Sequence, residues 1–258
     1  MKINSAEKLS NKLVKAFLKN KIISPLPLKF TKQLKNADKF RKLCESKVND
    51  SIIGFKAGGT ALPVMKKLKE KEPFYASVYK RNFLKNGKAV KINKSTLGIE
   101  LEVCYLVKKE FFDYKKALTI NNIGQFISHI AACIEVVGYR QRKKGIKSFG
   151  DLCSDFGGNI KFIIGNKKKY KKINIGNCQT ILENINSKKK TFGNTNTVYI
   201  NPLNSLKFVL GKLRKDKVTL NKNFFVFTGS TVGVVPISAK GLFIGKINKV
   251  GRVQTYIK

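Results

Sequence analysis

Hydrophobic and polar positions in the first fifty residues follow the period of a helix. In residues 5–20 the apolar side chains fall on one face with lysines beside them, as in a short amphipathic helix. The segment 23–27, Ile-Ser-Pro-Leu-Pro, interrupts this pattern. A second helical pattern runs from about residue 31 to residue 47. We therefore expect residues 1–50 to form a helical N-terminal arm or cap.

After residue 50 the pattern changes to short apolar stretches that end in glycine turns. We predict strands at 52–60, 99–107, 134–139, 161–164, 171–175, 197–200, 224–228 and 242–247, and helices at 63–71, 121–133 and 202–214. Short strands dominate the second half of the chain. The pattern predicts an α+β fold built round a curled mixed β-sheet, with residues 51–258 as the main domain.

The charge of the chain is far from balanced. Its 258 residues include 53 Lys and Arg against 15 Asp and Glu, a net charge of +38. Such an excess attracts polyanions such as nucleic acid. A nucleic-acid binder usually concentrates its charge, whereas the basic clusters here recur along the chain, at 66–71, 143–144, 167–172 and 188–190. We favour a compositional background over dedicated binding, and expect nucleic acid to bind only through non-specific charge.

Cysteine usage and hydropathy bear on the compartment. The five cysteines are odd in number, widely spaced and without a CxxC pair, which is typical of free thiols in a reducing compartment. No stretch approaches the roughly 20 apolar residues of a membrane span, and the N-terminus lacks the apolar stretch of a secretory signal. We expect a cytoplasmic protein that does not associate with membranes.

Acidic residues are scarce, so their positions carry information. Glu100 and Glu102 stand two residues apart in an otherwise apolar strand, and therefore project from the same face. Glu135 lies between β-branched residues in the next predicted strand. Three carboxylates in apolar surroundings suggest a hard divalent cation, which would neutralise them. The alternative is a solvated strand face on which the glutamates pair with lysines, and spacing alone does not decide between the two.

The order of six segments favours the metal site. They are Gly54–Thr60 (GFKAGGT), Glu100–Val107 (ELEVCYLV), Ile134–Arg140 (IEVVGYR), Asp151–Asp155 (DLCSD), Asn201–Leu203 (NPL), and Phe227–Ser230 (FTGS) followed by Pro236. From about residue 40 to the C-terminus, the chain resembles the fumarylacetoacetate hydrolase superfamily. Within it, the chain is most similar to the branch of 2-keto-4-pentenoate hydratases and 4-oxalocrotonate decarboxylases.

This resemblance implies a fold, a cofactor and a substrate class. It implies a β-roll core, with Mg²⁺ or Mn²⁺ bound by Glu100, Glu102 and Glu135. The substrate would be a small 2-oxo or 2-hydroxydienoic acid that chelates the metal, so that the enolate formed by a proton shift is stabilised. Lys56 matches the lysine of the active site, where it would act as an acid or base or hold an anion. Relatives of this kind form homo-oligomers.

Two further residues are candidates for substrate binding. Arg140 could hold the substrate carboxylate through its two parallel N–H groups, although a surface arginine beside Arg142 is the alternative. Ser230 could donate to the same carboxylate from its turn. The single histidine, His129, is assigned to the helix before the Glu135 strand, and the resemblance gives it no role.

Several positions depart from the family pattern. Phe74 stands where an acidic residue is expected, and Gly138 replaces an aspartate. Phe156 replaces the asparagine after Asp155, and the glycines that follow it replace a stretch that often carries serine. Because the metal glutamates, Lys56 and Arg140 are retained, we favour a working enzyme over a relic.

Three functions follow as hypotheses. The first is a metal-dependent hydratase of 2-hydroxypenta-2,4-dienoate-like acids, or the neighbouring decarboxylase of 2-oxo-3-hexenedioate. The second, hydrolysis of an acylpyruvate, commonly uses a histidine to activate water, and no histidine precedes the metal strand. The third is a degenerate, non-catalytic basic protein that binds nucleic acid.

Overall fold

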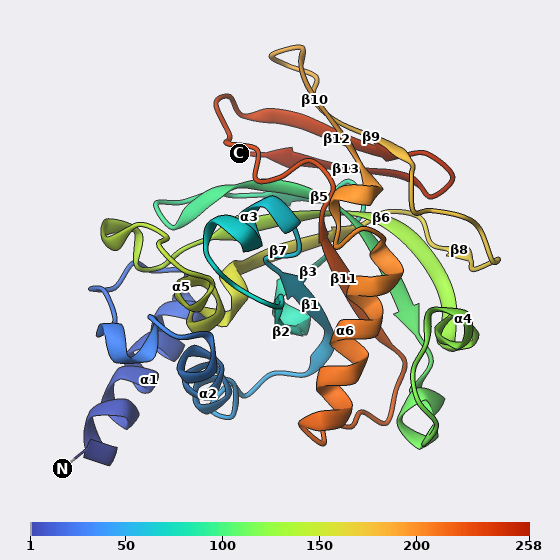
Figure 1. The fold of residues 1–258 in the computed structure, drawn as a ribbon. Helices are drawn as coiled ribbons and strands as arrows, with labels where there is room; N and C mark the ends of the chain where they lie inside the picture. The colour runs from blue at the N-terminus through green and yellow to red at the C-terminus, as the bar shows by residue number, and fades with distance from the viewer. Residues whose placement is uncertain (1) are drawn as a thin grey trace.

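The computed structural model describes residues 2–258 and has the α+β architecture that the sequence predicts (Figure 1). Its helices are α1 (Lys2–Lys19), α2 (Leu34–Glu45), α3 (Leu62–Lys67), α4 (Ile120–Ile123), α5 (Phe149–Ser154) and α6 (Pro202–Lys215). Its strands are β1 (Ile52–Gly58), β2 (Phe74–Tyr79), β3 (Phe83–Lys85), β4 (Ala89–Val90), β5 (Thr96–Val107), β6 (Ile127–Gly138), β7 (Asn159–Ile164), β8 (Lys168–Lys169), β9 (Gln179–Asn184), β10 (Lys189–Asn194), β11 (Phe224–Ser230), β12 (Gly241–Ile247) and β13 (Gly251–Ile257).

The larger sheet has the order β2-β1-β11-β5-β6-β7-β3, and β8 pairs with β6. The sheet curls strongly. Phe83 on the terminal strand β3 stacks against Phe225 on the third strand β11, with ring centroids 6.4 Å apart, so strands far apart in the order lie close in space. Val78 of β2 and Phe162 of β7 likewise share one buried cluster inside the curl. This curled mixed sheet is the one the sequence pattern predicts.

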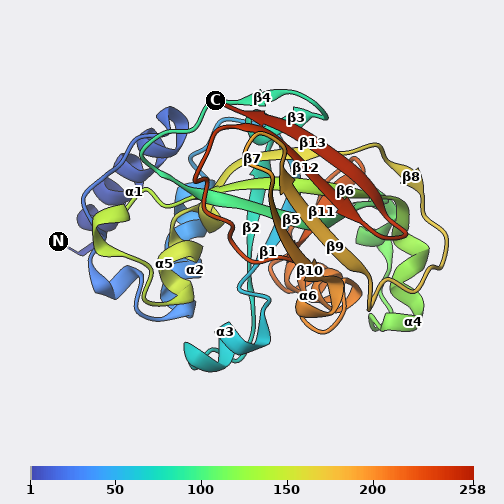
Figure 2. The ribbon, with the colours of Figure 1, turned by 90° about the horizontal axis from the view of Figure 1, so that it is seen from above.

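The second sheet, β10-β9-β12-β13-β4, lies over part of the larger one, above β5 and β6 in Figure 1 and across them in Figure 2. The main core is formed by apolar residues of β5 and β6, of the second sheet and of α6. On β5, Leu101, Val103 and Tyr105 point into this core, whereas the alternate residues Glu102 and Cys104 point to the interior of the curl. The alternation along β5 thus separates an apolar core from a second face that carries the glutamates.

The helices α1, α2 and α5 are grouped on one side of the molecule, away from α4 and α6 (Figures 1 and 2). The amphipathic α1 buries Leu13 and Phe17, as its pattern predicts. These residues join Phe40 of α2 and reach Phe156, in the turn after α5. The N-terminal helices therefore pack directly on the segment that follows α5.

Three predicted elements are wrong. The helix predicted over 121–133 is limited to α4 and a short 3-10 turn, and β6 begins at Ile127. Its period is that of a strand, since Ile130, Ala132 and Ile134 face the main core and the residues between them face the other way. The predicted strands at 171–175 and 197–200 are loop and turn. Ile175 and Val198 of these segments are nevertheless buried, whereas Ile200 is 61% exposed.

Two further predictions concern the thiols and the membrane. All five cysteines are free and buried. Among residues 2–258, no helix combines the length and the apolar character that crossing a membrane requires.

Candidate metal centre

The pairing of β5 with β6 brings the three predicted glutamates together. Glu100 lies directly opposite Glu135 in the antiparallel register, and Glu102 lies opposite Cys133. Cross-strand neighbours and i, i+2 residues share one face of a sheet. One carboxylate oxygen of each glutamate lies within 4.8 Å of the other two, a group that could hold a metal ion.

These carboxylates are withdrawn from water. Glu102 and Glu135 are completely buried, and Glu100 is half-buried. Burial is the largest cause of the raised pKa of all three groups, and raises the pKa of Glu135 to about 7 although Lys56 opposes it. The solvated-face alternative for these glutamates is therefore excluded.

Lys56 on β1 lies beside the cluster. Its ammonium donates to Oε1 of Glu135 at 2.7 Å and to the backbone carbonyl of Gly157 at 3.2 Å, and its side chain is 5% exposed. Burial acts to lower the pKa of Lys56, but the three glutamates outweigh it and raise that pKa. The lysine is thus held as a cation against the carboxylates, and cancels one of their three charges.

Two buried oxygens test whether the residues fit a cation. Oε1 of Glu102 and Oε2 of Glu135 find no hydrogen-bond partner among the described residues. The other oxygen of Glu102 accepts from the backbone N–H of Gly229 at 3.0 Å. Buried carboxylate oxygens without partners cost free energy unless a cation or water satisfies them. Oxygen ligands with surplus negative charge suit Mg²⁺ or Mn²⁺.

Arg140 lies in a different environment from that expected of a substrate-binding residue. It is completely buried, and its guanidinium pairs with Oδ1 of Asp155 at 2.9 Å and donates to the carbonyl of Asn159 at 2.8 Å. Its backbone N–H donates to the other oxygen of Asp155. Because both terminal nitrogens are engaged within the protein, we do not retain a substrate-carboxylate role for Arg140.

Ser230 and His129 are placed by neighbouring strands. Ser230 on β11 lies opposite Glu102 of β5, is half-buried, and donates its hydroxyl to the carbonyl of Gly233. It therefore lies next to the cluster, and its predicted role stays a proposal. His129 lies on β6 and not on a helix, opposite Leu106, several residues along the strand from Glu135.

Two backbone groups of the site could not be predicted from the sequence. The carbonyl of Gly157 and the N–H of Gly229 contact Lys56 and Glu102, yet backbone atoms leave no residue-type signature. The available signal was the glycines themselves, since both have positive φ, at 68° and 103°.

Two positions that depart from the family pattern have apolar or crowded surroundings. At Gly138, a Cβ atom would lie 2.7 Å from the backbone carbonyl oxygen of Ser95 and 2.1 Å from Cδ1 of Ile160, so an aspartate does not fit this backbone. Phe74 is buried and packs edge-to-face against Phe149, with its ring over Gly58 on the strand that carries Lys56. The structure thus replaces the expected acids by apolar packing beside the site.

Comparisons with known proteins locate the fold. Neither the models of protein families nor the curated sequences give a match to this chain. Among solved structures, 4-oxalocrotonate decarboxylase from Pseudomonas putida G7, complexed with magnesium and adipate, superposes with a TM-score of 0.84 at 16% identity. The match covers 100% of this chain and 99% of that chain.

More distant structures match less of the chain. Fumarylpyruvate hydrolase from Pseudomonas aeruginosa, in complex with Mn²⁺ and pyruvate, has a TM-score of 0.60 at 10% identity and covers 82% of this chain and 92% of its own. A 5-carboxymethyl-2-hydroxymuconate delta-isomerase from Mycobacterium smegmatis has a TM-score of 0.58 at 13% identity, with 81% and 80% covered. The chain has the fold of these enzymes, and over its whole length that of 4-oxalocrotonate decarboxylase.

Proposed function

We propose that this protein is a divalent-metal-dependent enzyme of the fumarylacetoacetate hydrolase superfamily that acts on small 2-oxo acids. The observation that carries the proposal is the buried cluster of Glu100, Glu102 and Glu135, with two carboxylate oxygens that lack a partner among the described residues. Solved structures of the same fold contain Mg²⁺ or Mn²⁺, which supports Mg²⁺ or Mn²⁺ as the cofactor here.

The residues divide the chemistry between them. A bound Mg²⁺ or Mn²⁺ supplies Lewis acidity toward the 2-oxo group of the substrate. In this proposal the three glutamates would hold the cation, and Ser230, opposite Glu102 in the strand pairing, would exchange its bond to the carbonyl of Gly233 for one to a substrate carboxylate. Lys56 brings a buried ammonium to the same position, where it can give up a proton or hold an anionic group. The burial of Lys56, Glu102 and Glu135 strengthens the electrostatic interactions among them.

Within this class we favour a hydro-lyase, a hydratase of 2-hydroxypenta-2,4-dienoate-like acids, with 2-oxo-3-hexenedioate decarboxylation as the alternative. The full-length superposition on 4-oxalocrotonate decarboxylase supports that branch of the superfamily. Hydrolysis of an acylpyruvate is less favoured, because the single histidine lies on β6 opposite Leu106 and not beside the carboxylates in the strand pairing. Phe74 stands where an acidic residue is expected, so a second proton donor would have to be another residue. The hydratase and the decarboxylase would differ in which group that is.

The test is an ultraviolet assay with a panel of substrates. The metal-stripped protein, reloaded with Mg²⁺ or Mn²⁺, is incubated with 2-hydroxydienoic acids, 2-oxo-3-hexenedioate and acylpyruvates, and loss of the conjugated chromophore is followed. We expect turnover of at least one acid with metal and none after chelation. Products separate water addition, loss of CO₂ and C–C hydrolysis. A protein that binds metal yet converts none of these acids would contradict the proposal.

Assembly and compartment are part of the same proposal. We expect a homo-oligomer, as the resemblance implies, and sedimentation velocity of the purified protein tests it. The five free and buried cysteines support a reducing compartment such as the cytoplasm.

A further inference from the structure

The carbonyl that holds Lys56 belongs to a turn of unusual backbone conformation. Phe156, Gly157 and Gly158 have successive φ values of 53°, 68° and 77°. Glycine adopts this left-handed region freely, but a bulky residue such as phenylalanine does so only at a cost. The turn also lies against the lysine itself, because a Cβ on Gly157 would lie 3.4 Å from Cδ of Lys56. The position of the ammonium therefore depends on what keeps Phe156 in place.

A ring of the N-terminal arm keeps it there. Phe17 of α1 stacks on Phe156, with centroids 4.1 Å apart and planes inclined by 21°, and both rings are buried. The guanidinium of Arg140 also lies over the ring of Phe17, 4.9 Å from its centroid. Aromatic and cation–π contacts of this kind stabilise the arrangement in which they form. They therefore help to offset the strain at Phe156.

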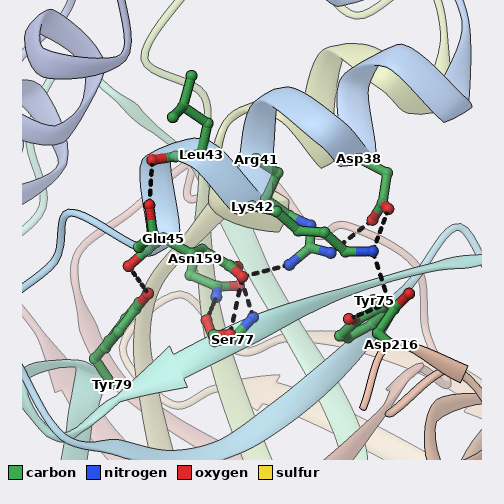
Figure 3. A network of polar contacts seen from close by, with 11 residues as sticks. Asp38, Arg41, Lys42, Leu43, Glu45, Tyr75, Ser77, Tyr79, Asn159 and Asp216 are labelled. Atoms are coloured by element: carbon green, nitrogen blue, oxygen red, sulfur yellow. Dashed lines mark hydrogen bonds and ion pairs between the residues drawn. The ribbon is translucent and has the colours of Figure 1, made fainter. Parts of the chain in front are cut away.

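Both ends of the turn are anchored as well. Arg140 bonds to both ends of the turn. Its guanidinium donates to the carboxylate of Asp155, before the turn, and to the backbone carbonyl of Asn159, after it. Asn159 donates to the carbonyl of Ser77 on β2 at 2.8 Å. Ser77 in turn donates its N–H and hydroxyl to Glu45, at the end of α2 (Figure 3). Thus α1 contacts the middle of the turn, and α2 fixes its end through β2.

We propose that the N-terminal arm positions Lys56 through the turn at 156–158. The positioning residues are Phe17 in the arm and Arg140, which follows β6. The inference rests on the proposed function for its catalytic consequence, but its structural content, the placement of the ammonium, does not. The metal-binding glutamates lie on β5 and β6 and do not depend on this turn for their strand register. Loss of the stack should then disturb proton transfer and leave metal binding intact.

The matched variants are Phe17→Leu and Phe40→Leu. Both remove a buried ring from the same cluster, but the ring partner of Phe40 is Phe30 and not Phe156. Because Phe17→Leu could unfold the arm, Phe156→Asn breaks the same stack from the turn, at a left-handed position that asparagine tolerates. Circular dichroism and thermal melting establish that each variant is folded.

The first readout needs no turnover. A ¹H–¹⁵N correlation of lysine ammonium groups in the metal-stripped protein should show one protected signal that disappears in Lys56→Met. We expect this signal to shift or vanish in Phe17→Leu and Phe156→Asn, and to remain unchanged in Phe40→Leu. Mn²⁺ should still bind at one site per chain in all three variants, since the pairing of β5 with β6 holds the carboxylates together.

The second readout is steady-state kinetics on the acid that the wild type converts. Phe17→Leu and Phe156→Asn should lower kcat roughly 10- to 100-fold with little change in KM, because small displacements of a catalytic group have effects of this size. Phe40→Leu should leave kcat unchanged. An unshifted Lys56 signal in folded Phe17→Leu and Phe156→Asn, or an equal loss in Phe40→Leu, overturns the inference. A shifted signal in Phe17→Leu and Phe156→Asn, together with a wild type that converts no acid, upholds the inference and contradicts the proposed function alone.

Discussion

At the scale of single residues, the site is a balance of four charges that are buried or half-buried. Lys56 neutralises part of the charge of Glu100, Glu102 and Glu135, and one negative charge or more is left for a cation to offset. Burying an uncompensated charge costs several kcal/mol, so the metal-free protein compensates by binding protons more tightly. The raised pKa of Glu135, at about 7, is the sign of this compensation.

The stability of the metal-free protein should therefore depend on pH through Glu135. Its pKa rises from an ordinary value of 4.5 to about 7, so the folded state binds a proton more tightly than the unfolded state does. Stability is then greatest below the unfolded value and falls as pH rises towards 7, by about 3 kcal/mol at about 1.4 kcal/mol per pKa unit.

Urea denaturation of wild type and Glu135→Gln between pH 5 and pH 8, in a chelator, measures this. Because Glu135 also contributes to the raised pKa of Glu102, the difference between the two proteins reports the titration of the carboxylate cluster and removes that of the rest of the chain. We expect Glu135→Gln to gain stability relative to wild type as pH rises. Parallel curves for the two proteins would show that Glu135 titrates as an ordinary glutamate.

At the scale of helices and strands, the sequence predicts elements with a regular hydrophobic period. It misses elements whose type depends on pairing with a distant strand. The amphipathic period of α1 and the apolar alternation of β5 are local, and both elements form where predicted. The sequence pattern predicts a helix for the first half of β6, because Ile123, Ile127 and Ala131 also fit a helical spacing. Pairing with β5 decides for the strand, and pairing is not a local property.

The site divides along the same line. The glutamates could be predicted because charged residues in apolar strands are rare, and Lys56 because a resemblance places it. Arg140 was assigned to the substrate since a sequence does not show that Asp155 lies within 2.9 Å of it. Phe17 carries no chemical signal at all, and its stack on Phe156 joins residues 139 positions apart in the chain. The division into an arm at 1–50 and a domain at 51–258 stays a prediction.

Replacing two glycines in different elements by alanine should change the free energy of unfolding in opposite directions. Gly211 lies in the middle of α6, and an added Cβ would meet nothing within 4 Å. Gly211→Ala should raise the free energy of unfolding by about 0.5–1 kcal/mol through helix propensity. At Gly58 on β1, the Cβ would lie 2.3 Å from Cζ of Phe74, so Gly58→Ala should destabilise. Urea titrations that show the same sign for both would contradict the packing described for α6 and β1.

At the scale of the whole molecule, the net charge of +38 invites comparison with nucleic-acid binding. If the charge is compositional background, duplex DNA should bind only through its phosphates. Binding should then weaken steeply between about 50 and 200 mM salt, and should not exceed that of a lysine-rich protein of similar charge. Fluorescence anisotropy over a salt series measures this. Sequence-selective binding that persists near physiological salt would favour the nucleic-acid hypothesis instead.

The central claim is that Glu100, Glu102 and Glu135 hold a divalent cation, and calorimetric titration of the metal-stripped protein with Mn²⁺ tests it most directly. We expect one site per chain in wild type and in Glu110→Gln, a control that removes an exposed acid. Glu102→Gln should abolish that site and the thermal stabilisation that accompanies it. Absence of binding in wild type, or equal binding in Glu102→Gln, would contradict the account.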